Sequence, residues 1–163
     1  MSQHPISAQK VAEYLLYLDQ ETNGKDIAGR LGWEPISNLK LQKLLYYCQS
    51  IHLINEDSAL FSDKIIAWKY GPVVEDVYYT HKPAMAKKFI DYYPQINQPE
   101  LLKSAKNSIQ LVYNVFFKYS GGQLVDMTHS EEPWRSTYDK NNEGVEITQK
   151  LIKKFFKERF NVK

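Results

Sequence analysis

The sequence contains one cysteine, Cys48, among its 163 residues. A single thiol excludes an intramolecular disulfide framework and a zinc site built mainly on thiolates. Long apolar runs are also missing: Ile65-Ile66-Ala67-Trp68 is among the longest, whereas a membrane-spanning helix needs about 20 apolar residues. The N-terminal residues show no charged segment followed by an apolar stretch, which is the pattern of a secretory signal. These absences predict a cytoplasmic protein with no membrane partner.

Arginine is scarce as well. Only Arg30, Arg135 and Arg159 occur among the 21 basic residues, and 19 acidic residues leave a formal net charge of +2. Arginine is the residue best suited to bidentate contacts with phosphates and bases, so this composition argues against a dedicated nucleic-acid binder. One alternative stays open near the C-terminus. A helical face there could meet nucleic acid or an acidic partner, or simply be solvated; it carries Lys150, Lys153, Lys154 and Lys157.

Hydrophobic residues make up 43% of the chain, which is too many for wholesale disorder, and the length is typical of one domain. Their spacing is mostly helical. The clearest helix is capped by Ser37 or Asn38 and ends near Asn55, with an apolar stripe of Leu41, Leu44, Leu45, Cys48, Ile51 and His52. Further helices are predicted from Ser7 to just before Asn23, from Pro72 to about His81, from Pro99 to about Phe116, from Leu124 to Thr128, and after the cap Thr148.

One segment is typical of a β-strand. Residues Ile65 to Tyr70 are too few for a helix and rich in β-branched and aromatic types. Gly71-Pro72 predicts a turn after this strand, because proline lacks an N–H and glycine permits unusual dihedral angles. Ser120-Gly121-Gly122 predicts the end of the helix that precedes it. The predicted fold class is α+β, mainly α-helical: one compact domain over residues 1–163 with a short β element near residues 65–70.

No group of residues has the spacing that catalysis or cofactor binding requires. The four histidines lack a metal-binding spacing, and Gly121-Gly122 lacks the lysine and hydroxyl residue of a phosphate loop. Cys48 lies on an apolar stripe, where a thiol is expected to be inert packing. We therefore predict no catalytic residue, no cofactor and no metal. The alternative is an enzyme that uses His129 with Glu131 or Asp126 as acid and base.

The remaining signal is a set of aromatic residues around two segments, 69–73 and 128–134. Tyrosine and tryptophan often anchor protein interfaces, because they bury a large area with few rotatable bonds and keep a polar tip. The same side chains could equally fill the core of a small domain, and composition does not choose between these interpretations. The residues are Trp68, Tyr70, Tyr78, Tyr79, Trp134 and Tyr138.

A series of short motifs covers nearly the whole chain, between Ile6 and Phe156. The motifs are Leu39-Lys40-Leu41-Gln42-Lys43-Leu44-Leu45-Tyr46-Tyr47-Cys48-Gln49, Leu60-Phe61, Ile66-Ala67-Trp68-Lys69-Tyr70-Gly71-Pro72-Val73-Val74, Val77-Tyr78 and Leu124-Val125-Asp126-Met127-Thr128-His129-Ser130-Glu131-Glu132-Pro133-Trp134. In sequence and in order, they resemble the motifs of the Panacea domain, the SocA-like antitoxin family. Cys48 departs from the family motif, which has a small residue such as alanine at this position.

The resemblance implies a bacterial or phage-encoded antitoxin of a type II toxin–antitoxin system, which binds a cognate protein toxin and neutralises it by direct contact. The alternative that the resemblance implies is a proteolytic adaptor, which would deliver the toxin to an ATP-dependent protease as a second partner. Nucleic-acid binding by this domain alone is not expected. The motif residues could instead be mainly determinants of the fold. The candidate partner-binding residues are Lys43, Tyr47, Trp68, Tyr70, Tyr78, His129 and Trp134.

Overall fold

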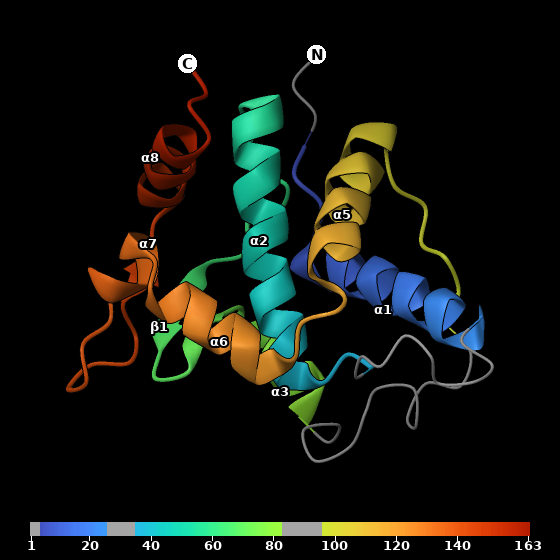
Figure 1. The fold of residues 1–163 in the computed structure, drawn as a ribbon, viewed down its shortest axis with the longest axis horizontal. Coiled ribbons are helices and arrows are strands. Elements are labelled where there is room, and N and C mark those ends of the chain that lie inside the picture. Colours follow the sequence, from blue (N-terminus) through green and yellow to red (C-terminus); the bar gives the residue numbers. More distant parts are fainter. Residues whose placement is uncertain (1–3, 26–34, 83–95) are drawn as a thin grey trace.

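Helix α2 (Asn38–Glu56) is the central element of the fold. In the computed structural model, which describes residues 4–25, 35–82 and 96–163, α2 contacts α1 (Ala8–Lys25), α5 (Lys103–Phe116), α6 (Gly121–His129) and α8 (Gln149–Arg159). Figure 1 shows α2 standing between α8 on one side and α5 on the other. Two short helices, α3 (Glu75–Thr80) and α7 (Glu132–Arg135), and three short strands complete the described chain. The predicted fold class, a mainly helical α+β domain, is confirmed.

The start of α2 follows from a side-chain cap. Ser37 has extended backbone, and its hydroxyl oxygen accepts a hydrogen bond from Lys40 N at 3.2 Å. The helix ends where Asp57 adopts a left-handed conformation with φ 55°. The predicted bounds of this helix are therefore confirmed. The same kind of cap starts α8, where the Thr148 hydroxyl accepts from Leu151 N at 3.2 Å.

Burial around α2 extends well beyond the apolar stripe that the sequence predicts on one side of the helix. Because other helices surround α2, most of its side chains are buried, polar ones included. Lys40 Nζ donates to Phe117 O at 2.6 Å, while the Gln49 amide donates to Phe61 O at 2.7 Å and accepts from Leu60 N at 2.8 Å. Each buried amide or ammonium group thereby finds a partner in a neighbouring segment, as burial of a polar group requires. These bonds join α2 to the loops around it.

The small sheet is antiparallel, with strand order β2-β1-β3. Strand β1 (Ile65–Trp68) pairs on one side with β2 (Gly71–Val73) and on the other with β3 (Glu146–Ile147). The predicted strand is confirmed, although it ends before Tyr70. Strand β3 was not predicted, because two residues are too few to show an alternating pattern.

The prediction for Gly71-Pro72 is wrong in detail. The chain reverses at Lys69 and Tyr70, and Gly71-Pro72 form the start of β2 rather than the turn. Pro72 pairs in register with Ala67, and it is tolerated because β2 is an edge strand that needs no hydrogen bond on its outer side. The helix expected from Pro72 begins at Glu75 instead.

Ser120-Gly121-Gly122 starts a helix rather than ending one. Helix α5 already ends at Phe116, and Ser120 forms a capping box with Gln123 at the start of α6. The Ser120 hydroxyl accepts from Gln123 N at 3.1 Å, and Gln123 Oε1 accepts from Ser120 N at 2.8 Å. Other elements also differ from the prediction: α1 continues to Lys25, past Asn23, α5 begins at Lys103 rather than at Pro99, and α7 was not predicted.

Buried side chains from α1, α2, α5, α6, α8, β1 and β3 share one hydrophobic core. Aromatic rings connect its helices: Tyr47 stacks on Phe116 with ring centroids 4.4 Å apart, and Tyr46 meets Phe156 edge-on at 5.9 Å. Cys48 is fully buried here, and burial raises the pKa of its thiol, so it is packing rather than a reactive group. Among the described helices, none is long and apolar enough to cross a membrane.

Candidate partner-binding site

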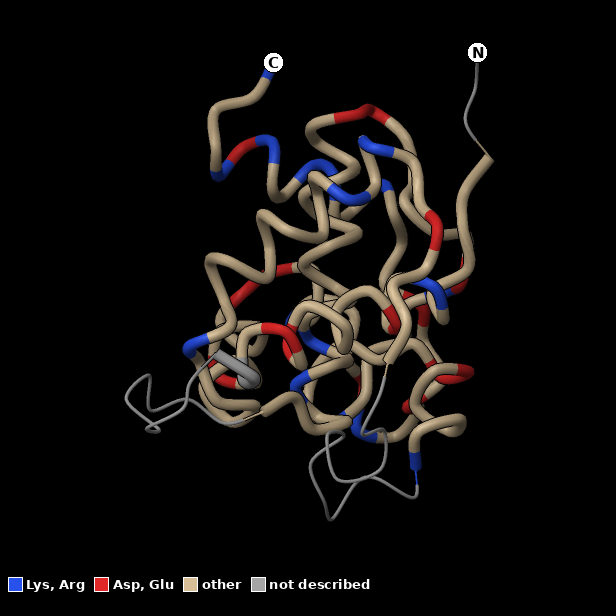
Figure 2. The backbone as a smooth tube through the Cα atoms, turned by 90° about the vertical axis from the view of Figure 1, so that its right-hand side faces the viewer, with Lys and Arg blue, Asp and Glu red and all other residues tan. Residues whose placement is uncertain are grey.

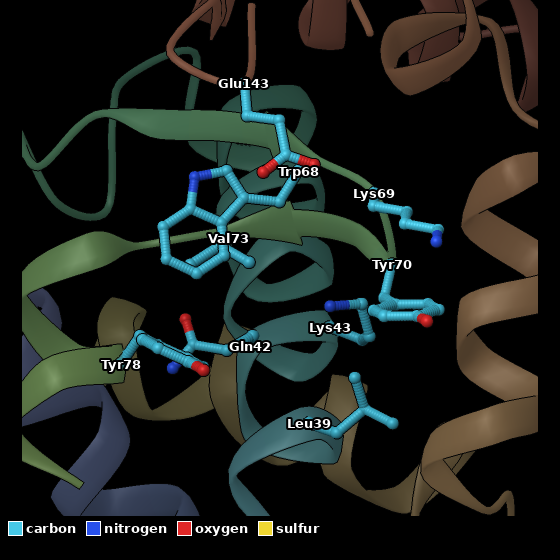
Figure 3. Close-up of a pocket in the computed structure, with 9 residues that line it drawn as sticks. All are labelled: Leu39, Gln42, Lys43, Trp68, Lys69, Tyr70, Val73, Tyr78 and Glu143. Atoms are coloured by element: carbon cyan, nitrogen blue, oxygen red, sulfur yellow. The ribbon is translucent and has the colours of Figure 1, made fainter. Parts of the chain in front are cut away.

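A cavity of about 310 Å³ lies beside the hairpin that β1 and β2 form (Figure 3). We call it the hairpin pocket. Helix α2 supplies one part of its lining, the hairpin another, and α3 and the segment before β3 the rest. The structure thus brings together Lys43, Trp68, Tyr70 and Tyr78 from the predicted set. The complete lining is Leu39, Gln42, Lys43, Trp68, Lys69, Tyr70, Val73, Tyr78 and Glu143.

The rim of the hairpin pocket exposes apolar and aromatic side chains. Tyr70 is 59% exposed, Leu39 is 40% exposed, and Tyr79, beside the pocket on α3, is 55% exposed. The Trp68 ring meets Tyr78 edge-on at 4.8 Å and Tyr79 at 6.1 Å, so the aromatic residues form a continuous surface. A patch of this kind on a folded protein is typical of an interaction site.

Two polar side chains of α2 also line the pocket. Gln42 Oε1 accepts from Val74 N at 2.9 Å, and Gln42 Nε2 donates to Asn38 Oδ1 at 3.0 Å, so this amide is engaged at both ends. Lys43 Nζ donates to Pro72 O at 3.1 Å, beneath the hairpin. Burial lowers the pKa of Lys43 to about 7, because the ammonium group is removed from bulk solvent. Lys43 therefore changes its charge near neutral pH.

His129 and Trp134 hold the backbone of the hairpin from outside the pocket. Trp134 Nε1 donates to Trp68 O at 2.7 Å, and His129 Nε2 lies 3.0 Å from Lys69 O. A carbonyl oxygen only accepts, so His129 Nε2 carries the proton. The two rings stack with centroids 3.9 Å apart. We call this pair the hairpin latch. It positions the hairpin pocket and does not line it.

Tyr47 lies in the core, away from the hairpin pocket. Its hydroxyl donates to the Glu131 carboxylate at 3.1 Å, and Arg159 Nη1 is 3.4 Å from Glu131 Oε2. Glu131 is 3% exposed, and burial raises the pKa of this carboxyl to about 7 against the opposing effects of Tyr47 and Arg159. The cluster joins α2, the start of α7 and the end of α8.

The structure separates the residues of the enzyme alternative. His129 Nε2 faces Lys69 O, whereas the Glu131 carboxylate faces Tyr47 and Arg159. Within residues 4–25, 35–82 and 96–163, no hydrogen bond or ion pair joins His129 to Glu131 or to Asp126. The three side chains therefore do not form a hydrogen-bonded pair in which one orients the other for proton transfer.

The basic face of α8 is partly neutralised. Figure 2 shows basic residues recurring along the chain close to the C-terminus. Two of them, Lys153 and Lys157, form ion pairs with Asp57, the residue that ends α2; for Lys157 the distance is 3.7 Å. These pairs anchor α8 to α2 and reduce the positive charge that would attract nucleic acid.

Comparison with known proteins agrees with the motifs. The family model "Antitoxin SocA-like, Panacea domain" matches residues 41–135, which is more than half of the chain. Antitoxin SocA of Caulobacter vibrioides (strain NA1000 / CB15N) is 29% identical over 136 residues, covering 77% of this chain and 72% of the relative. No solved structure matches. The family match therefore defines an antitoxin-type domain. The chain belongs to the SocA-like Panacea-domain antitoxin family.

The matched segment contains most of the hairpin pocket and the whole hairpin latch. Leu39, Glu143 and all of α8 lie outside it. The sequence-based prediction missed five pocket residues: Leu39, Gln42, Lys69, Val73 and Glu143. Leu39 carried a usable signal, because it is a large apolar residue next to the cap of α2, where the first turn is often exposed. Glu143 carried no usable signal, because the pairing of β3 with β1 is what brings the segment that contains Glu143 to the pocket.

Proposed function

We propose that this protein is the antitoxin of a type II toxin–antitoxin system and neutralises a cognate protein toxin by direct contact, without catalysis. Family membership supports the antitoxin role. The observation that carries direct contact is the exposed rim of the hairpin pocket, formed by Leu39 and Tyr70, with Tyr79 exposed beside it. Exposed aromatic side chains around a cavity are the arrangement that interface hot spots share, and truncation of such a residue typically costs about 2 kcal/mol or more of binding free energy.

The proposal extends to the setting of the protein. One hydrophobic core in the described residues supports a single domain over residues 1–163. A cytoplasmic location fits the absence, in the described part of the chain, of a helix able to cross a membrane, and it is where a type II toxin would be met. Of the predicted partner-binding residues, we assign direct contact to Tyr70, Tyr78 and Trp68, and support of the surface to His129 and Trp134. Lys43 is buried in the lining of the pocket.

Co-expression with the product of the neighbouring reading frame tests the proposal. We expect that product to arrest growth alone and to be harmless beside this protein. A matched pair of variants then locates the contact: Leu39→Asn at the pocket rim and Leu111→Asn on α5, where the leucine is 47% exposed. Leu39→Asn should weaken protection and Leu111→Asn should not. A harmless neighbour, unrelieved toxicity, or equal effects of the two variants would contradict the proposal.

The same cells separate sequestration from delivery to a protease. Toxin abundance is measured by immunoblot with and without this protein. Sequestration leaves the toxin level unchanged or higher while growth recovers. A fall in toxin level that depends on an ATP-dependent protease would instead identify a proteolytic adaptor, and direct contact alone would not then explain neutralisation.

A further inference from the structure

The hairpin pocket contains a buried lysine, Lys43, that forms no ion pair in the described chain. Lys43 Nζ donates a hydrogen bond to Pro72 O, whereas an ammonium group has three N–H bonds to donate. No ion pair within residues 4–25, 35–82 and 96–163 includes Lys43. Lysines are almost never fully buried unless they are paired. The position of Lys43 is therefore that of a cation whose anion is absent from the described chain.

The surroundings of Lys43 strengthen its attraction for an anion. Trp68, Tyr70 and Tyr78 give the pocket apolar walls, and the engaged Gln42 amide offers little competing polarity. Charges in an apolar cavity are weakly screened, so an anion in the pocket would interact with Lys43 without direct contact. Lys43 is fully buried, so its interaction with an anion in the pocket has to act without exposure of the ammonium group to solvent.

Two further charged side chains, one of each sign, belong to the lining of the pocket. Lys69 is exposed and adds a second positive charge beside Tyr70. Glu143 is the one carboxylate in the lining, and Figure 3 shows it on the Trp68 side of the cavity, away from Lys43. Aromatic walls alone would also suit a cationic ligand, but Lys43 and Lys69 together oppose one.

We propose that the hairpin pocket receives a partner residue in which a carboxylate lies next to an aromatic or aliphatic side chain, as in an apolar C-terminal residue. The apolar part fills the cavity between Trp68, Tyr70 and Tyr78, and the carboxylate is the negative counter-ion of Lys43. The inference rests on the proposed function, because the partner that presents this residue is the toxin.

Three small probes of similar shape test the chemistry on the full chain. They are N-acetylphenylalanine, its neutral amide N-acetylphenylalaninamide, and the cation phenethylammonium. Binding is followed by NMR at pH 6 to 7 through the Lys43 Cε resonance and the backbone amides of the hairpin. We expect the carboxylate to bind about tenfold more tightly than the amide and the cation to bind worst. Equal binding of acid and amide, a preference for the cation, or no binding of any probe up to its solubility limit would overturn the proposal.

A titration of the unmodified protein makes the test independent of any variant. The bound carboxylate should raise the pKa of Lys43, read from its Cε shift, and the bound amide should leave it unchanged. The variant pair Lys43→Met and Lys69→Met identifies the lysine responsible for the preference. Lys43→Met should abolish the preference for the acid, and Lys69→Met should keep most of it. Probe binding and toxin neutralisation are separate assays. A protein that fails to protect cells but selects the acid refutes the proposed function alone, and one that protects cells but does not select the acid refutes this inference alone.

Discussion

Replacement of Gly71 by alanine is the most direct test of how the hairpin is supported. Gly71 has φ 105°, and a Cβ there would lie 2.6 Å from Lys43 Cε and 2.8 Å from Thr128 Oγ1. An L residue at positive φ costs about 1–2 kcal/mol, and forcing apart two packed side chains adds about 1–3 kcal/mol. We therefore expect Gly71→Ala to reduce the free energy of unfolding by about 2–5 kcal/mol.

Urea unfolding followed by far-UV circular dichroism measures this change. The midpoint should fall while the slope stays constant, because the surface exposed on unfolding is nearly the same. Gly122→Ala is the matched control: at this exposed helical glycine a Cβ would have Ser120 Oγ as its nearest neighbour, 3.9 Å away. Alanine there should be neutral or stabilise by up to about 1 kcal/mol. A Gly71→Ala protein within about 0.5 kcal/mol of the parent would refute the reasoning.

Three further predictions concern the hairpin latch and the two buried ionisable groups. Trp134→Phe keeps a ring to stack on His129 but removes the donor to Trp68 O, so thermal unfolding should show a loss of about 1–2 kcal/mol; an unchanged midpoint would contradict the latch. Burial raises the Glu131 pKa to about 7, so the native state binds the proton more tightly than the unfolded chain. Stability should therefore fall as pH rises from about 4.5 to about 7, and Glu131→Gln should flatten that slope in urea midpoints. Burial lowers the Lys43 pKa to about 7, so the unfolded chain binds that proton more tightly; stability should rise with pH above 7, and Lys43→Met should remove the rise. Slopes identical to those of the parent would show that these groups do not titrate as the geometry implies.

The elements that the sequence predicts well are those whose signals are local. The caps Ser37 and Thr148 each bond a backbone N–H three residues further on, so a short stretch of sequence contains both partners. Strand β1 is recognisable from its β-branched and aromatic residues. In contrast, β3 has two residues and exists through its pairing with β1. Such a strand has no pattern of its own to detect.

The central position of α2 was missed for a different reason. A helix that is buried all round can carry Lys40 and Gln49 only if distant segments satisfy them, and here Phe117, Phe61 and Leu60 do so. Spacing along one helix does not contain that information. A polar residue on α2 looks solvent-facing until its partners are known.

The candidate site was predictable as two aromatic segments but not as two different roles. Both segments, 69–73 and 128–134, do meet at the hairpin. Geometry then divides them: His129 and Trp134 face backbone carbonyls, whereas Tyr70 faces solvent. All three residues are aromatic, so aromatic character does not distinguish the two roles. Only the three-dimensional arrangement shows which ring supports the surface and which is displayed on it.

The hairpin latch has a consequence for how this surface can change over evolutionary time. Its two hydrogen bonds end on the carbonyl oxygens of residues 68 and 69, and every amino acid has that oxygen. The exposed side chains of Lys69 and Tyr70 can therefore be replaced while both hydrogen bonds to the loop are kept. Mutations at these positions would change the chemical surface of the loop and leave its backbone conformation unchanged.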